Sequence, residues 1–211
     1  MLSLTEKERE TILILFKDFA AYYNANSISK MLKISHVGAQ KIFKRLLKEN
    51  LVKDQRIGKS IIYKLKLEDD YVCRLISFLL ADEANSRFKR WKEEFKALFK
   101  EGRIIMLFGS AAKNYEAARD IDILAVIGKK DYKEVKKIMN EKQELLPKEI
   151  HSIEMTEEDL TNNIKKRQGA IMDIIKSAVI LYGQDKYTEV IKNAASIYSC
   201  QMVPGKRNAF K

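Results

Sequence analysis

The sequence predicts an α+β protein built from two modules, and three observations support this prediction. Apolar residues recur at helical spacing through residues 6–48, and two β-type runs flank a glycine within residues 51–65. After Gly102, short apolar runs alternate with helical segments. A chain of 211 residues, 46% of them hydrophobic, can enclose two small cores.

The composition favours a cytoplasmic protein without membrane association. No run approaches the ~20 consecutive apolar residues that a membrane span requires. The first ten residues, MLSLTEKERE, lack the apolar segment of a secretion signal. The two cysteines, Cys73 and Cys200, are far apart in the chain, which argues against a disulfide scaffold and against a zinc ribbon.

Positive charge is concentrated in the first third of the chain. Residues 1–66 hold 14 Lys/Arg and 6 Asp/Glu, which places +8 of the total net charge of +11 there. Residues 28–66 hold 11 basic residues and only 2 acidic ones. Such a patch attracts polyanions such as nucleic acids. Charge alone leaves a solvated lysine-rich surface as the alternative.

The first module, residues 1–68, is expected to contain three helices followed by a hairpin. The predicted elements, in order, are a helix at 6–22 capped by Thr5, a helix at 27–33 capped by Ser27, a helix at 36–48 capped by Ser35, and strands at 51–55 and 61–65 around Gly58. Three helices and a two-stranded ribbon describe a winged helix-turn-helix. Residues 28–66 also resemble the winged helices of prokaryotic transcriptional regulators.

In such a motif the third helix enters the major groove of DNA, N-terminal end first. Gln40 can read a base edge, whereas lysines hold phosphates. The residues predicted to contact DNA are Ser35, His36, Gly38, Gln40, Lys41, Lys44 and Arg45 on the helix, and Arg56, Lys59 and Lys64 on the hairpin. The alternative is a winged helix that binds proteins or dimerises, which the positive charge disfavours.

Residues 69–101 are predicted to form a helical connector, because neither proline nor glycine interrupts them. Their apolar residues form one helical stripe, namely Phe88, Trp91, Phe95 and Leu98. We interpret this stripe as core or as the surface of a homodimer, rather than as a ligand site.

The second module is expected at residues 102–200, followed by a disordered tail at 201–211. Its predicted elements are a strand at 104–108, a short helix from Ser110, a strand at 121–127, a helix at 131–145, a strand at 149–155, a helix capped by Thr156, and a helical region at 168–199 interrupted near Gly183.

A Gly-Ser turn and an Asp-x-Asp pair are the chemically informative part of this module. Gly109 would let a phosphate approach the backbone, and a helix that begins at Ser110 would offer it free N–H groups. Asp120 and Asp122 project from the same face of a strand, with Cα atoms about 6.7 Å apart. Two such carboxylates can hold Mg²⁺ together with a triphosphate, and Lys113 can neutralise phosphate charge.

The pattern resembles the nucleotidyltransferase superfamily that includes DNA polymerase β, and in particular its minimal nucleotidyltransferases. The resemblance covers about residues 103–183 and includes the ending Ile180-Leu181-Tyr182-Gly183. It implies a nucleotidyltransferase fold, a mixed β-sheet with flanking helices, with Mg²⁺ as cofactor and an NTP as substrate or ligand. The phosphate- and metal-binding positions of the family correspond to Gly109, Ser110, Asp120 and Asp122.

The chain departs from the family at the third carboxylate, which usually lies on the next strand. The apolar pattern places His151 at that position, with Glu154 on the opposite face and Glu149 two residues early. An imidazole can bind a metal or act as a base. His151 is therefore a candidate catalytic residue beside Asp120 and Asp122, and a strand histidine without a catalytic role is the alternative.

Two functions follow, together with a third that rests on the resemblance alone. The first is a DNA-binding protein that transfers a nucleoside monophosphate from an NTP to an unknown acceptor with Mg²⁺. The second is a DNA-binding transcriptional regulator whose nucleotidyltransferase domain is degenerate and only binds a nucleotide or a partner. The third is a toxin–antitoxin component, because minimal nucleotidyltransferases often pair with a small helical protein.

Overall fold

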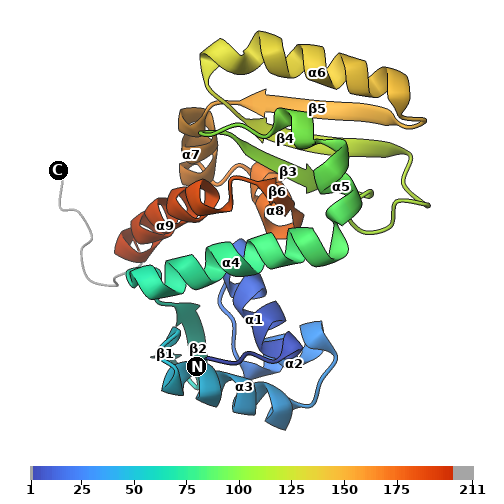
Figure 1. Cartoon of the computed structure of the whole chain (residues 1–211). Coiled ribbons are helices and arrows are strands. Elements are labelled where there is room, and N and C mark those ends of the chain that lie inside the picture. The colour runs from blue at the N-terminus through green and yellow to red at the C-terminus, as the bar shows by residue number, and fades with distance from the viewer. Residues whose placement is uncertain (1, 202–211) are drawn as a thin grey trace, which may run out of the picture.

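The structure is a computed structural model that describes the backbone of residues 2–201 and the side chains of residues 2–196 (Figure 1). Residues 202–211 of the predicted tail lie outside the described residues. Within the part that is described, no helix combines the length and the apolar character needed to cross a membrane.

The front of the chain has the predicted order of three helices and two strands. The elements are α1 (Glu6–Lys17), α2 (Ala25–Leu32), α3 (His36–Lys48), β1 (Val52–Ile57) and β2 (Ser60–Leu65). Thr5 and Ser35 cap α1 and α3 as predicted. The predicted cap of α2 was wrong, because Asn24 is the N-cap. Asn24 Oδ1 accepts from the N–H of Ser27, and the N–H of Asn24 donates to Ser27 Oγ, both at 2.9 Å.

The antiparallel hairpin of β1 and β2 packs on α3 through one aromatic pair. The rings of Tyr63 and Phe43 are stacked, with centroids 3.8 Å apart. The backbone N–H of Tyr63 also donates to the carbonyl of Tyr23, at 2.8 Å. The hairpin is therefore joined both to α3 and to the segment between α1 and α2.

The predicted connector contains three helical pieces instead of one helix. They are α4 (Asp70–Arg87), α5 (Lys89–Glu94) and the short 3₁₀ helix η1 (Lys96–Leu98). The chain leaves the helical conformation at Phe88, with φ −125° and ψ 23°. Trp91, Phe95 and Leu98 are buried against the sheet of the second module, so the interpretation of the stripe as core is confirmed.

The second module contains a four-stranded mixed sheet in the order β5-β4-β3-β6. Its strands are β3 (Ile104–Phe108), β4 (Asp120–Val126), β5 (Glu149–Met155) and β6 (Val179–Tyr182). β4 and β5 are parallel, whereas β3 is antiparallel to both of its neighbours. The accompanying helices are η2 (Lys129–Asp131), α6 (Tyr132–Leu145), α7 (Glu157–Lys165), α8 (Gly169–Ser177) and α9 (Gln184–Gln201).

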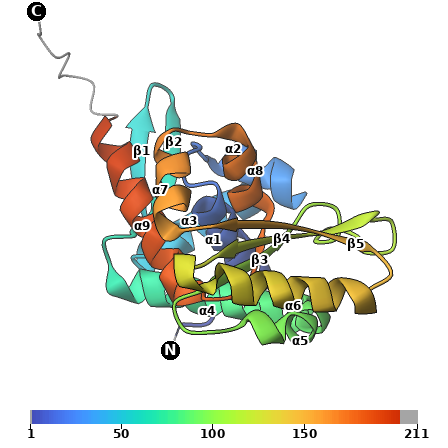
Figure 2. The ribbon, with the colours of Figure 1, turned by 90° about the horizontal axis from the view of Figure 1, so that it is seen from above.

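Helices cover both faces of this sheet (Figure 2). On one face, Ile123 of β4 packs in a cluster with Trp91 of α5 and Val135 of α6. On the other face, Leu124 belongs to a cluster with residues of α7, α8 and α9. Because side chains alternate along a strand, Asp120 and Asp122 lie on the same face as Leu124.

The helix α4 joins the two modules through one continuous apolar core. It contacts α1 on one side and both α9 and β6 on the other (Figure 1). The buried cluster runs from Phe16 and Ile28 in the front, through Ile76 of α4, to Met106 and Tyr187 in the rear. The segment predicted as a connector is thus part of the core that both modules share.

Two predicted elements of the rear module were wrong. Residues 179–182 form the strand β6, which pairs with β3, where the helical region expected at 168–199 was interrupted only near Gly183. The short helix expected from Ser110 is instead one turn followed by further turns, because the Asn114 side chain accepts from the N–H groups of Glu116 and Ala117. Asparagine competes in this way with the backbone bonds that would continue a helix.

Candidate active site

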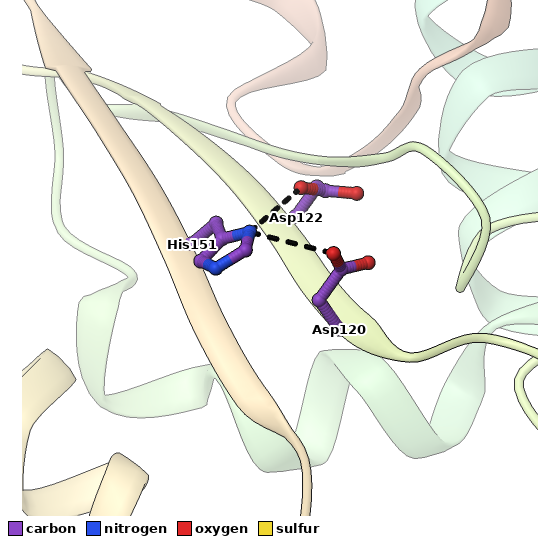
Figure 3. Close-up of side chains that lie close together, drawn as sticks. All are labelled: Asp120, Asp122 and His151. Atoms are coloured by element: carbon purple, nitrogen blue, oxygen red, sulfur yellow. Dashed lines mark ion pairs between the residues drawn. The ribbon is translucent and has the colours of Figure 1, made fainter.

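Asp120 and Asp122 of β4 and His151 of β5 form a compact group at one face of the sheet (Figure 3). One ligand atom of each residue lies within 4.8 Å of the other two. The parallel register places Asp122 directly opposite His151. Since opposite residues of neighbouring strands face the same side of a sheet, the register brings the three side chains together.

The imidazole of His151 contacts acidic side chains through both of its nitrogens. Its Nδ1 lies 3.5 Å from Asp120 Oδ2 and 3.8 Å from Asp122 Oδ1. Its Nε2 lies 3.5 Å from Glu149 Oε1. Glu154 takes no part in this group, because it lies on the opposite face of β5 and accepts a 2.6 Å hydrogen bond from Ser152 Oγ.

The two aspartates are an electrostatically strained pair. Burial raises the pKa of Asp122, the charge of Asp120 raises it further, and His151 opposes the rise. The side chains of Asp120 and Asp122 are 32% and 20% exposed, so solvent does not fully screen their repulsion. A cation between them would relieve that repulsion.

Gly109 brings the end of β3 against the Asp122 carboxylate. The φ angle of Gly109 is +72°, a backbone conformation that residues other than glycine rarely adopt. A Cβ at this position would lie 1.9 Å from Asp122 Oδ2. The adjacent Ser110 Oγ is 3.4 Å from Asp120 Oδ1, in donor geometry. The Gly-Ser turn therefore contacts both carboxylates, Asp122 through Gly109 and Asp120 through Ser110.

The phosphate cradle expected from a helix at Ser110 is reduced to a single turn. Two N–H groups, those of Lys113 and Asn114, donate to the carbonyl of Ser110 at 3.0 and 2.9 Å. The side chain of Lys113 is exposed at the rim of this turn. Free backbone donors for an anion come from one turn here and not from the end of a long helix.

Lys148 fixes the loop between β3 and β4, a role that was not predicted from the sequence. Its Nζ donates to the carbonyls of Tyr115, Glu116 and Ala118. The ammonium also lies 4.2 Å from the centre of the Tyr115 ring. A lysine before a strand has no local pattern that predicts a contact with carbonyls about thirty residues earlier in the chain.

The residues predicted to contact DNA fall into two groups. His36, Gln40, Lys41 and Lys44 of α3 and Arg56 and Lys59 of the hairpin are exposed. The other four have structural contacts.

Those structural contacts use a cap, an ion pair and an aromatic ring. Ser35 Oγ accepts from the N–H of Gly38 at 3.0 Å. Arg45 forms an ion pair with Glu8 at 3.2 Å and donates to the Ser3 carbonyl. Lys64 is half-buried over the ring of Tyr22, and its pKa is lowered by burial and by the charge of Lys53.

The donor set of the Asp-Asp-His group suits a divalent cation. An octahedral ion with bonds of about 2.1 Å holds adjacent donors about 3 Å apart and opposite donors about 4.2 Å apart. The distances from His151 Nδ1 to the two carboxylates, 3.5 and 3.8 Å, lie between these values. Small side-chain rotations would close the group around an ion.

Comparison with known proteins agrees with this geometry. Residues 92–187 match the family model described as "Polymerase beta, Nucleotidyltransferase". Searches of curated proteins and of solved structures found no significant match to the chain. The second module is thus a nucleotidyltransferase-like domain, and the matched segment includes the end of α5 and the whole of η1.

Proposed function

We propose that this protein binds DNA through residues 1–68 and transfers a nucleoside monophosphate from an NTP to an acceptor hydroxyl at the Asp-Asp-His site. The new ester bond forms at the α-phosphate, the α–β phosphoanhydride bond breaks, and pyrophosphate and the hydroxyl proton are released. The observation that carries the enzymatic part is the convergence of Asp120, Asp122 and His151 within 4.8 Å. The contact between Gly109 and Asp122 supports it, because the turn that would meet a triphosphate also positions a metal ligand.

The residues of the site would act mainly by positioning and by charge. Asp120, Asp122 and His151 would hold a divalent cation, which supplies charge neutralisation at the phosphates and at the acceptor oxygen. Ser110 and the N–H groups of its turn would orient the phosphates, with Lys113 at the rim as a further positive charge. Lys148 would keep the loop that carries these groups in place.

The transfer is tested by nucleotide binding and by labelling. We expect ATP, GTP, CTP or UTP to bind in calorimetry only with a divalent cation, and an Asp120→Asn/Asp122→Asn double variant to lose this binding. Glu154→Gln is the matched control, because Glu154 lies on the same strand as His151 but on the opposite face. Equal binding by the double variant and the wild type would refute the site.

DNA binding by the front module is proposed from its charge and its exposed cations. Lys41 and Lys44 of α3 and Arg56 and Lys59 of the hairpin are exposed, as required of phosphate contacts. The three helices and the hairpin have the element order of a winged helix-turn-helix, in which α3 would be the recognition helix.

This part is tested by fluorescence anisotropy with a labelled duplex at several salt concentrations. Each lysine that contacts a phosphate contributes about one unit to the slope of log K against log salt. Lys41→Ala/Lys44→Ala should therefore lower that slope by about two. The control is Lys137→Ala on α6, whose side chain is 78% exposed. An equal loss in control and test variants would refute an interface on α3.

His151 in place of the third carboxylate favours a second candidate, a DNA-binding transcriptional regulator with a non-catalytic nucleotide site. Asp120 and Asp122 would then bind a metal–nucleotide complex without turnover. Metal-dependent NTP binding without transfer of label to protein, RNA or small-molecule acceptors would favour this candidate over the enzyme.

A further inference from the structure

We infer that the Asp-Asp-His site selects a transition-metal dication over Mg²⁺, with His151 Nδ1 as a direct ligand. The inference rests on the proposed function only in that both require a metal at Asp120 and Asp122. It goes further by assigning the chemical class of that metal from this chain's own donor atoms.

The first argument is the chemistry of the donors. Mg²⁺ favours oxygen ligands and gives up its water reluctantly, whereas imidazole nitrogen suits first-row transition metals. Nδ1 is the atom of His151 that faces both carboxylates, at 3.5 and 3.8 Å. An ion shared by the two aspartates would therefore meet a nitrogen donor.

The second argument is the carboxylate behind the imidazole. Histidines that bind metals usually donate their other N–H to a carboxylate or carbonyl, which fixes the tautomer. Glu149 Oε1 lies 3.5 Å from His151 Nε2, on the side away from the aspartates. A proton on Nε2 would face Glu149, and the lone pair of Nδ1 would then face the pair of carboxylates. Glu149 is thus a positioning residue for His151.

The third argument is that the register sets an imidazole, and not a carboxylate, opposite Asp122. The parallel pairing of β4 and β5 holds the backbone of His151 opposite Asp122, and Glu149, which is opposite Asp120, has its Oε1 on the Nε2 side of the imidazole. Glu154 lies on the opposite face with Ser152. Among the residues that the structure describes, the only group of three metal-ligating side chains is Asp120, Asp122 and His151.

The test uses Mn²⁺ as the probe, with the full chain stripped of metal and no nucleotide present. Electron paramagnetic resonance counts bound Mn²⁺, and pulsed measurements detect the ¹⁴N nucleus of a coordinated imidazole. Mg²⁺ is then added as competitor to measure the ratio of the two affinities. The variants are His151→Asp, Glu149→Gln and His36→Asp. His36 is the matched control, because the chain has only two histidines.

We expect one Mn²⁺ per chain with a ¹⁴N signal that persists in His36→Asp and disappears in His151→Asp. The latter should shift the affinity ratio toward Mg²⁺ by about tenfold or more. Glu149→Gln should keep the ¹⁴N signal and weaken Mn²⁺ binding by up to about tenfold.

Mn²⁺ bound through Asp120 and Asp122 without a ¹⁴N signal, with an unchanged ratio in His151→Asp, would overturn the inference. The proposed function would survive that result. Absence of any metal binding, with or without NTP, would overturn both.

Discussion

Replacement of Gly109 by alanine should disable the site through Asp122, and a second glycine of the same chain separates this effect from backbone strain. A Cβ at Gly109 would lie 1.9 Å from Asp122 Oδ2, where ordinary contact begins at 3.4 Å. The carboxylate must therefore retreat by far more than the roughly 0.2 Å that metal–ligand distances tolerate. We expect the affinity for Mn²⁺ to fall at least about tenfold, as in Asp122→Asn.

The cost in stability has two parts. An alanine at φ +72° costs about 1–2 kcal/mol, and moving Asp122 off its rotamer adds about 1 kcal/mol. Gly102 has φ +82° and nothing within 4 Å of an added Cβ. Gly102→Ala should therefore lower the free energy of unfolding by about 1–2 kcal/mol and leave metal binding unchanged.

Urea denaturation measures the free energy of unfolding, and Mn²⁺ titration measures the metal affinity. If the loss acts through Asp122, the double variant Gly109→Ala/Asp122→Asn should bind no more weakly than Asp122→Asn alone. Wild-type metal affinity in Gly109→Ala, or an equal loss in Gly102→Ala, would refute the reasoning.

Three further predictions concern stability and the loop beside the site. Burial and Asp120 raise the pKa of Asp122, so the metal-free folded state binds that proton more tightly than the unfolded state and loses stability as pH rises through the raised pKa. Asp122→Asn should therefore raise the thermal midpoint of EDTA-treated protein at pH 7, and a lower midpoint would contradict this. Gly183→Ala should lower the free energy of unfolding in urea by about 3 kcal/mol or more. The reason is that its Cβ would lie 2.2 Å from the Arg103 carbonyl oxygen, at a φ of +81°. A loss no larger than that of Gly102→Ala would argue against the clash. Lys148→Met should speed hydrogen–deuterium exchange in residues 110–119 and weaken NTP binding, and unchanged exchange would mean that the three carbonyl contacts do not hold the loop.

Elements with a strong local pattern were predictable from the sequence. The strand Glu149–Met155 alternates between two faces, and Thr156 begins a helix with Asp159 three residues later as a capping box. The run Val179–Tyr182 has no such pattern, because a short, fully apolar segment fits a buried strand and a buried helix equally well. Its strand conformation depends on pairing with β3, which lies more than seventy residues earlier.

The site likewise has features that depend on local sequence patterns and features that depend on long-range contacts. The spacing of Asp120 and Asp122 and the alternation around His151 are local, and they were sufficient to predict which side chains share a face. The approach of Gly109 to Asp122, and that of Lys148 to the loop, depend on how β3 and β5 flank β4 in space. Gly109 and Asp122 belong to one short motif, but no local pattern shows that their atoms touch, and Lys148 lies about thirty residues after the carbonyls that it contacts.

The core that α4 shares with both modules has a consequence for how the protein unfolds. Separating residues 1–68 from the rest would expose one side of α4, including Ile76 and Leu80, together with Phe16 of α1, all of which are fully buried. A fragment that ends before α4 would thus present a wide apolar surface to water and would tend to aggregate. The two modules should melt in a single cooperative transition, and a fragment made to test DNA binding by residues 1–68 must keep α4, which also packs against the sheet that carries the Asp-Asp-His group.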